Sequence, residues 1–186
     1  MLKGILNVAY DLLENSIEKG ETTIDATCGN GNDTLFLSKV TGENGHVFAF
    51  DIQDQAIKTT NQLLKEYSRK NVTLIQDSHA NISDYVAVEQ QIGGAIFNLG
   101  YLPRSDKSII TRGESTITAL NTILHHLKKY GLIVIVVYHG HAGGKQEKDA
   151  LLKYVGSLEQ KAFTVLQHGF INQQNDPPFI LAIQKR

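Results

Sequence analysis

The chain alternates short apolar, β-branched runs with longer segments whose apolar residues recur every three or four positions. The short runs have the composition of strands, and the periodic segments have the spacing of helices that bury one face. Residues 132–137 are apolar at every position, which is typical of a parallel strand covered on both faces. This alternation predicts an α/β fold in which helices cross over between parallel strands.

The elements can be placed along the chain from these patterns. We predict helices at residues 2–17, 33–40, 53–67, 82–89, 114–129 and 146–158, and strands at residues 22–26, 46–50, 72–76, 95–98 and 132–137. The rhythm changes at the end, where the apolar runs 163–169 and 179–185 are separated by a segment too short for a crossover helix. These two strands should therefore pair antiparallel.

Length and composition indicate one globular domain over residues 1–186, with 41% hydrophobic and 20% charged residues. No apolar run approaches the roughly 20 residues that span a membrane, and the start lacks a signal-peptide pattern. We therefore expect a soluble, cytoplasmic protein without a membrane partner. The single cysteine, Cys28, excludes an intrachain disulfide and a cysteine-rich metal site. The net charge of −1 gives no overall basic field, so a nucleic-acid partner would need a local basic patch.

The turn after the first predicted strand carries the clearest ligand-binding pattern. Gly29 and Gly31 alternate there with Asn30 and Asn32, and both residue types accept a positive φ. Asp25 stands four residues before the first glycine, which gives the spacing D-x-x-x-G-x-G. A carboxylate at a strand end can accept a hydrogen bond from an ammonium group, or hold waters beside one.

A second acidic residue, Asp51, ends the next predicted strand. It lies about 20 residues beyond the glycines, the distance expected of a carboxylate that binds ribose hydroxyls. Ile52 and Gln53 then offer an apolar surface for an adenine ring. The glycines also fit G-x-G-x-x-G in part, but Thr34 occupies the third position, which weakens an NAD-binding interpretation. Capping roles for Asp25 and Asp51 are the structural alternative.

Three stretches of the sequence resemble one family. They are DATCGNGNDT at 25–34, NLGYLP at 98–103 and YHGH at 138–141. The first resembles class I S-adenosylmethionine-dependent methyltransferases, and all three resemble the bacterial family labelled putative rRNA methylase. Members of that family are understood as tRNA wobble-uridine methyltransferases, which convert 5-aminomethyluridine to 5-methylaminomethyluridine.

The resemblance covers essentially the whole chain and implies a Rossmann-like class I methyltransferase fold. That fold has a seven-stranded, mostly parallel sheet of order 3-2-1-4-5-7-6, with strand 7 antiparallel and helices on both faces, and the predicted elements match it. The resemblance further implies S-adenosylmethionine as cofactor, a tRNA anticodon stem-loop as partner, and a homodimer.

The loops that follow the parallel strands should meet at one edge of the sheet, where ligands bind in such folds. Asp77, Ser78 and His79 follow the third strand. We expect Asp77 to accept a hydrogen bond from the adenine amino group, with Ser78 and His79 beside the ring. A role for Asp77 or Ser78 in capping the next helix is equally compatible with the sequence.

The stretch from Asn98 to Tyr101 resembles the N-P-P-Y motif of amino methyltransferases at its first and fourth positions and lacks both prolines. In that motif the Asn oxygen and the next backbone carbonyl accept hydrogen bonds from the target amine, and the aromatic residue stacks on the base. His139 and His141 follow the fifth strand. Histidine has an unperturbed pKa of about 6.5, so one of them can remove the amine proton. Without a clear third ligand we expect no metal.

The predicted site residues fall into three groups. The cofactor-binding residues are Asp25, Thr27, Gly29, Asn30, Gly31, Asn32, Asp51, Ile52, Gln53, Asp77, Ser78, His79, Asn98 and Gly100, and the catalytic residues are Asn98, Tyr101, His139 and His141. The substrate-binding residues are Tyr101, Leu102, Pro103, Arg104, Lys107, Arg112, Tyr138, His139 and Lys145. A small-molecule amine methyltransferase, an rRNA methyltransferase, an NAD-dependent reductase and a non-catalytic module are the alternatives.

Overall fold

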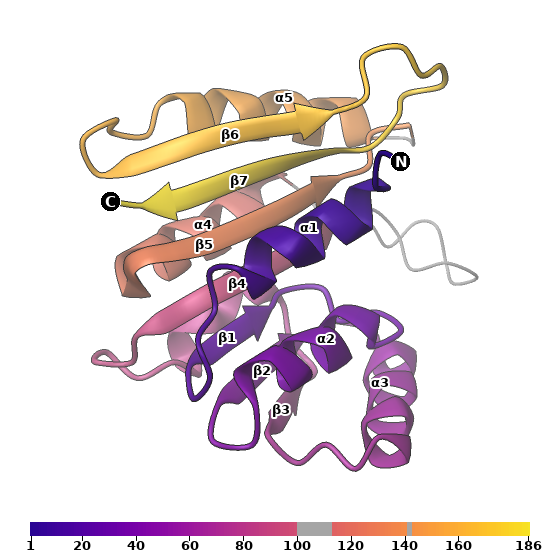
Figure 1. Cartoon of the computed structure of the whole chain (residues 1–186), viewed down its shortest axis with the longest axis vertical. Coiled ribbons are helices and arrows are strands. Elements are labelled where there is room, and N and C mark those ends of the chain that lie inside the picture. The colour runs from indigo at the N-terminus through magenta and orange to yellow at the C-terminus, as the bar shows by residue number, and fades with distance from the viewer. Residues whose placement is uncertain (100–112, 141–142) are drawn as a thin grey trace.

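The computed structural model describes residues 1–99, 113–140 and 143–186. At its centre lies a seven-stranded sheet of order β3-β2-β1-β4-β5-β7-β6, with helices on both faces (Figure 1). Strands β1 to β5 run parallel, and β7 is antiparallel to both β5 and β6. The predicted strand order and the antiparallel end of the sheet are confirmed.

The elements follow the predicted alternation. The helices are α1 (Ile5–Glu14), α2 (Asn32–Thr41), α3 (Asp54–Glu66), α4 (Gly113–His126) and α5 (Gly144–Gly156), with a 3-10 helix η1 (His79–Asp84). The strands are β1 (Thr22–Asp25), β2 (His46–Phe50), β3 (Val72–Ile75), β4 (Ile92–Leu99), β5 (Leu127–Val137), β6 (Phe163–Gly169) and β7 (Phe179–Lys185). In the part of the chain that the structure describes, no helix combines the length and apolarity needed to cross a membrane.

Strand β5 shows how the sheet separates two apolar cores. Ile133 and Ile135 face the core that includes residues of α4, α5 and η1. Val134 and Val136 face the opposite core, which includes residues of α1 and α2. Successive side chains of a strand point to opposite faces, so a strand covered on both sides must be apolar throughout.

Helix α1 packs against β5 and lies across that face of the sheet (Figure 1). Ile5, Ala9 and Leu13 are spaced four residues apart, so they share one side of the helix, and all three are buried in the core beneath it. The helix is shorter at both ends than the predicted segment 2–17, although Ile17 is still buried. This packing fixes which residues of α1 face α2.

The predicted helix at 82–89 is wrong. The chain instead forms η1, which begins at His79 and ends at Asp84. Ser78 starts it early, because its Oγ accepts a hydrogen bond of 3.2 Å from the backbone nitrogen of Ala80. Ile82 and Val86 are four residues apart, which is the spacing of a helix. Both are buried in the core, although no continuous helix joins them.

The predicted boundary between the helix 114–129 and the strand 132–137 is also wrong. Helix α4 ends at His126, and β5 begins directly at Leu127, which pairs with Ile92 of β4. The register of this pairing shifts between Ile92 and Gly94. Tyr130 has a φ of 63°, a left-handed conformation that no helix continues through. The early part of β5 therefore belongs to the sheet although its sequence looks helical.

Leu13 is fully buried between α1 and the sheet, so it tests the packing of this helix. We expect Leu13→Ala to lower the free energy of unfolding by about 2–5 kcal/mol, because buried contacts are lost and a cavity remains. Urea denaturation followed by circular dichroism measures the change. Leu2→Ala is the control, since Leu2 is exposed, and equal losses in the two variants would contradict the packing described.

Candidate functional site

The predicted site residues come from the loops at the carboxyl ends of the parallel strands. Strands β1, β2, β4 and β5 run in the same direction, so the segments that follow them meet at one edge of the sheet (Figure 1). Ligands of open α/β sheets bind at this edge.

The turn between β1 and α2 holds both predicted glycines in left-handed conformations. Gly29 has a φ of 51° and Gly31 a φ of 85°. A Cβ on Gly31 would lie 2.9 Å from Oγ1 of Thr60 in α3, and Thr60 Oγ1 also donates a hydrogen bond of 3.1 Å to the carbonyl of Gly29. Gly31 is thus required by the close approach of α3. Asn30 and Asn32 flank it and are exposed.

Asp51 ties this turn to the end of β2. Its Oδ2 accepts a hydrogen bond of 3.0 Å from the backbone nitrogen of Gly29, and its Oδ1 accepts one of 2.9 Å from that of Gln53. Burial raises the pKa of Asp51, while these backbone bonds act in the opposite direction. Each carboxylate oxygen keeps a further lone pair, so both can still accept a ligand hydroxyl. The adjacent Ile52 exposes 54% of its surface, which suits an apolar ring.

Asp25 is fully buried at the end of β1. Its Oδ1 accepts a hydrogen bond of 3.1 Å from the backbone nitrogen of Thr27, and its Oδ2 accepts one of 2.6 Å from the hydroxyl of Thr34. Thr34 occupies the position where the dinucleotide fingerprint has glycine, and its hydroxyl serves there as a hydrogen-bond donor to Asp25. Burial, followed by the nearby carboxylate of Asp33, raises the pKa of Asp25. Its predicted contact with an ammonium group stays a prediction.

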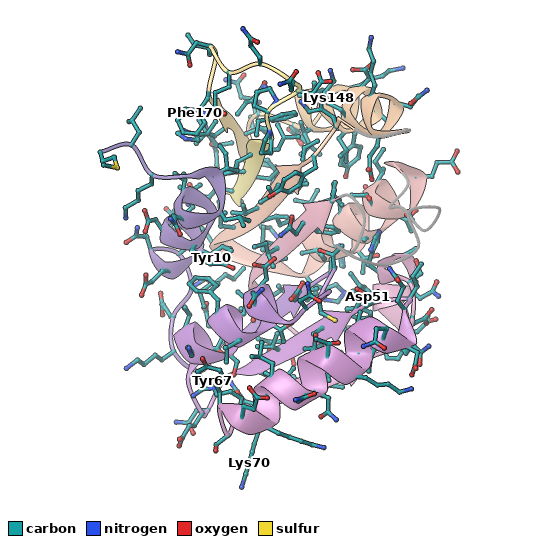
Figure 2. The ribbon with its side chains drawn as sticks, turned by 90° about the vertical axis from the view of Figure 1, so that its right-hand side faces the viewer. Tyr10, Asp51, Tyr67, Lys70, Lys148 and Phe170 are labelled. Carbon is teal, nitrogen blue, oxygen red and sulfur yellow. The ribbon has the colours of Figure 1, made fainter. Side chains whose placement is uncertain are left out.

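Asn98 lies near the end of β4 and is held at two points. Its backbone nitrogen donates a hydrogen bond of 2.8 Å to the hydroxyl of Thr27, and its side-chain Nδ2 donates one of 3.1 Å to Oδ2 of Asp33. The other oxygen of Asp33 accepts a hydrogen bond of 2.5 Å from the hydroxyl of Tyr10. Tyr10 points from α1 toward α2 (Figure 2), where its ring stacks on Phe36.

The sequence did not identify Asp33 or Tyr10 as site residues. Asp33 begins the predicted helix 33–40, and Tyr10 lies within the predicted helix 2–17, whose apolar spacing gives no role to its hydroxyl. A usable signal was present in each case: an acid directly after a glycine turn, and a polar-tipped ring on the covering helix. What joins them to Asn98 is the fold, since 23 residues separate Tyr10 from Asp33 and 65 separate Asp33 from Asn98.

Polar groups in the segment after β3 form hydrogen bonds with one another. Asp77 accepts hydrogen bonds from the backbone nitrogen of Ser78, from Nδ2 of Asn81 and from the hydroxyl of Tyr85. The hydrogen bond from Tyr85 is the main reason that the pKa of Asp77 is lowered. Ser78 caps η1, which is the capping role that the sequence allowed for it. The predicted contact of Asp77 with an adenine amino group stays a prediction.

His79 is buried beside the end of β1. Its Nδ1 lies 3.1 Å from the carbonyl oxygen of Ala26, so Nδ1 carries the hydrogen and donates. Its Nε2 is buried without a hydrogen-bond partner, and burial lowers the pKa of His79. The ring meets Phe97 edge to face. His79 is therefore a neutral side chain between the core and the segment after β3.

The segment after β5 holds two further predicted residues. His139 directs Nδ1 toward Oδ1 of Asp176 at 3.6 Å, and its ring lies against Phe179 of β7. Tyr138 is half-buried, and burial together with the carboxylate of Asp33 raises its pKa. Tyr138 is therefore near the group formed by Tyr10, Asp33 and Asn98.

Several predicted residues lie outside the described part of the chain. They are Gly100, Tyr101, Leu102, Pro103, Arg104, Lys107, Arg112 and His141. Lys145 lies in the first turn of α5 and is exposed. Within the described ranges, no group of three or more His, Cys, Asp or Glu side chains is arranged to hold a metal ion.

Comparison with known proteins adds independent information on this arrangement. A family model described as "Putative rRNA methylase" matches residues 47–184. A chloroplastic protein of Arabidopsis thaliana named tRNA (mnm(5)s(2)U34)-methyltransferase is 35% identical, over 98% of this chain and 70% of its own length.

Two solved structures are similar over the full length of both chains at 43% identity. A crystal structure of a protein titled putative rRNA-methylase from Clostridium thermocellum superposes with a TM-score of 0.97. A protein from Streptococcus mutans described as a putative methyltransferase, solved in complex with SAH, superposes with a TM-score of 0.92.

The raised pKa of Asp25 gives a stability test with a definite sign. The folded chain keeps a proton on Asp25 at pH values where the unfolded chain has released it, so the fold loses stability as pH rises above about 4. Asn has no such ionisation cost. We expect Asp25→Asn to gain stability relative to the unchanged protein with rising pH, in urea denaturation over a pH series. Asp11→Asn, at a partly exposed position paired with Lys3, is the control. A pH-independent difference for Asp25→Asn would contradict the assignment.

Proposed function

The chain belongs to the family described as Putative rRNA methylase, whose members are S-adenosylmethionine-dependent methyltransferases, and we propose that it methylates the 5-aminomethyl group of a tRNA wobble uridine. The product is then 5-methylaminomethyluridine. The name of the Arabidopsis thaliana relative, a methyltransferase for position 34 of tRNA, supports this substrate class.

The residues at the ends of β1 and β2 fit the proposed cofactor. Asp51 offers free lone pairs on both carboxylate oxygens, which suits the two hydroxyls of a ribose, and the exposed Ile52 suits an adenine face. The related Streptococcus mutans structure, which contains SAH, supports the same assignment. When bound, S-adenosylmethionine supplies an activated methyl group on its sulfonium. We propose that the other predicted cofactor residues in the turn contact the ligand through their backbone.

The orientation of the Asn98 side chain is the observation that carries the proposal. Its Nδ2 is occupied by Asp33, which leaves Oδ1 to accept a hydrogen bond from another group. An amine is a suitable donor, because a hydrogen bond from its N–H to Oδ1 orients its lone pair. We propose that Asn98 Oδ1 and the carbonyl of Leu99 hold the target amine, with Tyr101 stacked on the base.

His139 is the proposed acceptor of the amine proton. An ammonium ion has no lone pair, so the substrate must lose a proton before it can attack the methyl carbon. Nδ1 of His139 faces the carboxylate of Asp176. This contact orients the ring, and we propose that Nε2 takes the proton.

The proposed partner is the anticodon stem-loop of tRNA. The net charge of −1 provides no general attraction, so binding depends on local cations. Lys145, exposed in the first turn of α5, is one proposed phosphate contact, and Arg104, Lys107 and Arg112 are others, on the segment outside the described residues.

We also propose that two copies of the chain pair. Strand β6 forms the edge of the sheet, and its Val165 and Leu166 expose 36% and 49% of their surfaces. An open edge with exposed apolar side chains is a surface that folded proteins commonly cover.

A small-molecule amine methyltransferase is the second candidate, and the near-neutral net charge favours it. It would use the same turn, Asp51 and Asn98. The two candidates differ in whether tRNA is bound and modified.

The cofactor assignment predicts that Asp51→Ala abolishes binding of S-adenosylhomocysteine. Each lost hydrogen bond to the carboxylate removes about 1.5–3 kcal/mol of binding free energy. Isothermal titration calorimetry measures the affinity, and circular dichroism verifies the fold. Asp54→Ala is the matched control, because Asp54 is an exposed acid at the start of α3. It forms an ion pair with Lys58. Unchanged affinity in folded Asp51→Ala would remove the residue from the cofactor site.

The substrate assignment predicts a change in tRNA composition. Cells without this protein should lose 5-methylaminomethyluridine and its derivatives from tRNA and accumulate the 5-aminomethyl precursor. Mass spectrometry of tRNA nucleosides measures both species, with rRNA nucleosides from the same cells as the control. A change in rRNA alone, or in neither RNA, would refute the tRNA assignment.

A further inference from the structure

The carboxylate of Asp33 joins two parts of the molecule that are far apart in sequence. It accepts a hydrogen bond from Nδ2 of Asn98 on one oxygen and one from the hydroxyl of Tyr10 on the other. Asp33 is only 6% exposed, and it lies in the first turn of α2, where the helix dipole favours a negative charge. The three side chains therefore form a continuous chain from α1 to the end of β4.

This arrangement decides which way the amide of Asn98 faces. The oxygen and nitrogen of an amide have nearly the same shape, so packing alone does not distinguish them. A carboxylate accepts hydrogen bonds and donates none. With the amide reversed, Oδ1 of Asn98 would face Oδ2 of Asp33 without a hydrogen between them. Asp33 therefore selects the orientation that leaves Oδ1 of Asn98 available as an acceptor.

Tyr10 fixes Asp33 in turn. Its hydroxyl lies 2.5 Å from Oδ1 of Asp33, and its ring stacks on Phe36 with the centroids 4.2 Å apart. Burial, followed by the charge of Asp33, raises the pKa of Tyr10, so the hydroxyl keeps its proton and remains a donor. Ala9 and Leu13, which are fully buried on either side of Tyr10 along the helix, hold α1 on the sheet.

We propose that Asp33 and Tyr10 are positioning residues for methyl transfer, which act by holding the amide of Asn98 with Oδ1 toward the target amine. The inference rests on the proposed function, in which that oxygen accepts a hydrogen bond from the amine. Neither residue needs to contact the substrate for this role.

Single-turnover methylation of tRNA that carries 5-aminomethyluridine measures the effect. Asp33→Asn allows either amide orientation, because the new side chain can donate to Oδ1 of Asn98, and the rate should fall about 10- to 100-fold. Tyr10→Phe keeps the stacking on Phe36 and removes one hydrogen bond, so the rate should fall roughly 3- to 10-fold. For Tyr10→Phe, the KM for tRNA and the affinity for S-adenosylhomocysteine should stay within about twofold.

A structural role is separated from a positioning role by two comparisons. Tyr154→Phe is the matched control, because it removes a tyrosine hydroxyl that donates a 2.8 Å hydrogen bond to Asn121 between α5 and α4. It should leave the rate unchanged. In an Asn98→Ala background, Tyr10→Phe should slow methylation no further, since its effect passes through the missing amide. An additive loss, or full activity of Asp33→Asn and Tyr10→Phe, would overturn the proposal.

A second readout does not depend on the substrate being correct. The side-chain amide signals of Asn98 can be assigned in a nitrogen-15 NMR spectrum by their disappearance in Asn98→Ala. In Tyr10→Phe and Asp33→Asn these signals should shift and exchange faster with water, while Tyr154→Phe leaves them in place. Unchanged signals in Tyr10→Phe and Asp33→Asn would overturn the positioning role. Lack of tRNA methylation by the unchanged protein would instead refute the proposed function alone.

Discussion

Three acidic side chains at the carboxyl edge of the sheet are held in place by hydrogen bonds. Asp25 is held by Thr27 and Thr34, and Asp51 by two backbone nitrogens. Asp33 is held by Tyr10 and Asn98. Among the described residues, no lysine or arginine forms an ion pair with any of the three. Burying carboxylates in this way costs free energy unless their oxygens are satisfied, so the turn, the end of β4 and α1 must all be in place together.

This constraint links the fold to the proposed chemistry. Asp33 and Asp51 both act to raise the pKa of Asp25, and an environment in which acids repel one another in this way favours a positively charged ligand. S-adenosylmethionine carries both an ammonium and a sulfonium. The same hydrogen bonds that satisfy the acids set the shape of the glycine turn and the direction of the Asn98 amide. Stability and site geometry therefore depend on the same few contacts.

The alternation of elements and the antiparallel end of the sheet follow from local patterns, and the strand order followed from the family resemblance that these elements match. Residues 132–137 are apolar throughout, as a strand covered on both faces must be, and Asp51 directly follows the apolar run that forms β2. The failures occurred where contacts distant in sequence outweigh local spacing. Ser78 begins a short 3-10 helix where apolar spacing indicated a longer one, and pairing with β4 draws Leu127 into the sheet from a segment that looks helical.

The missed site residues have the same explanation. Nothing near Tyr10 in the sequence indicates that its hydroxyl meets Asp33, because that contact exists only once α1 lies on the sheet. The sequence explains only part of the need for glycine at position 31. The close approach of Thr60, which leaves no room for a side chain there, depends on how α3 packs. Residue types and spacing thus locate a site, while the contacts that orient it arise from tertiary packing.

The position of α1 also determines the order in which the molecule can assemble. Although α1 precedes every strand, it packs on β5 and touches β7, both of which come much later in the chain. During synthesis the helix therefore emerges long before two of the strands that it covers, and its contacts with β5 and β7 form only once those strands are present. Contacts between segments so far apart in sequence must first close a long loop, which slows their formation. The bond from Tyr10 to Asp33 requires α1 to lie on the sheet, so a partly synthesised chain can contain the glycine turn without a completed site.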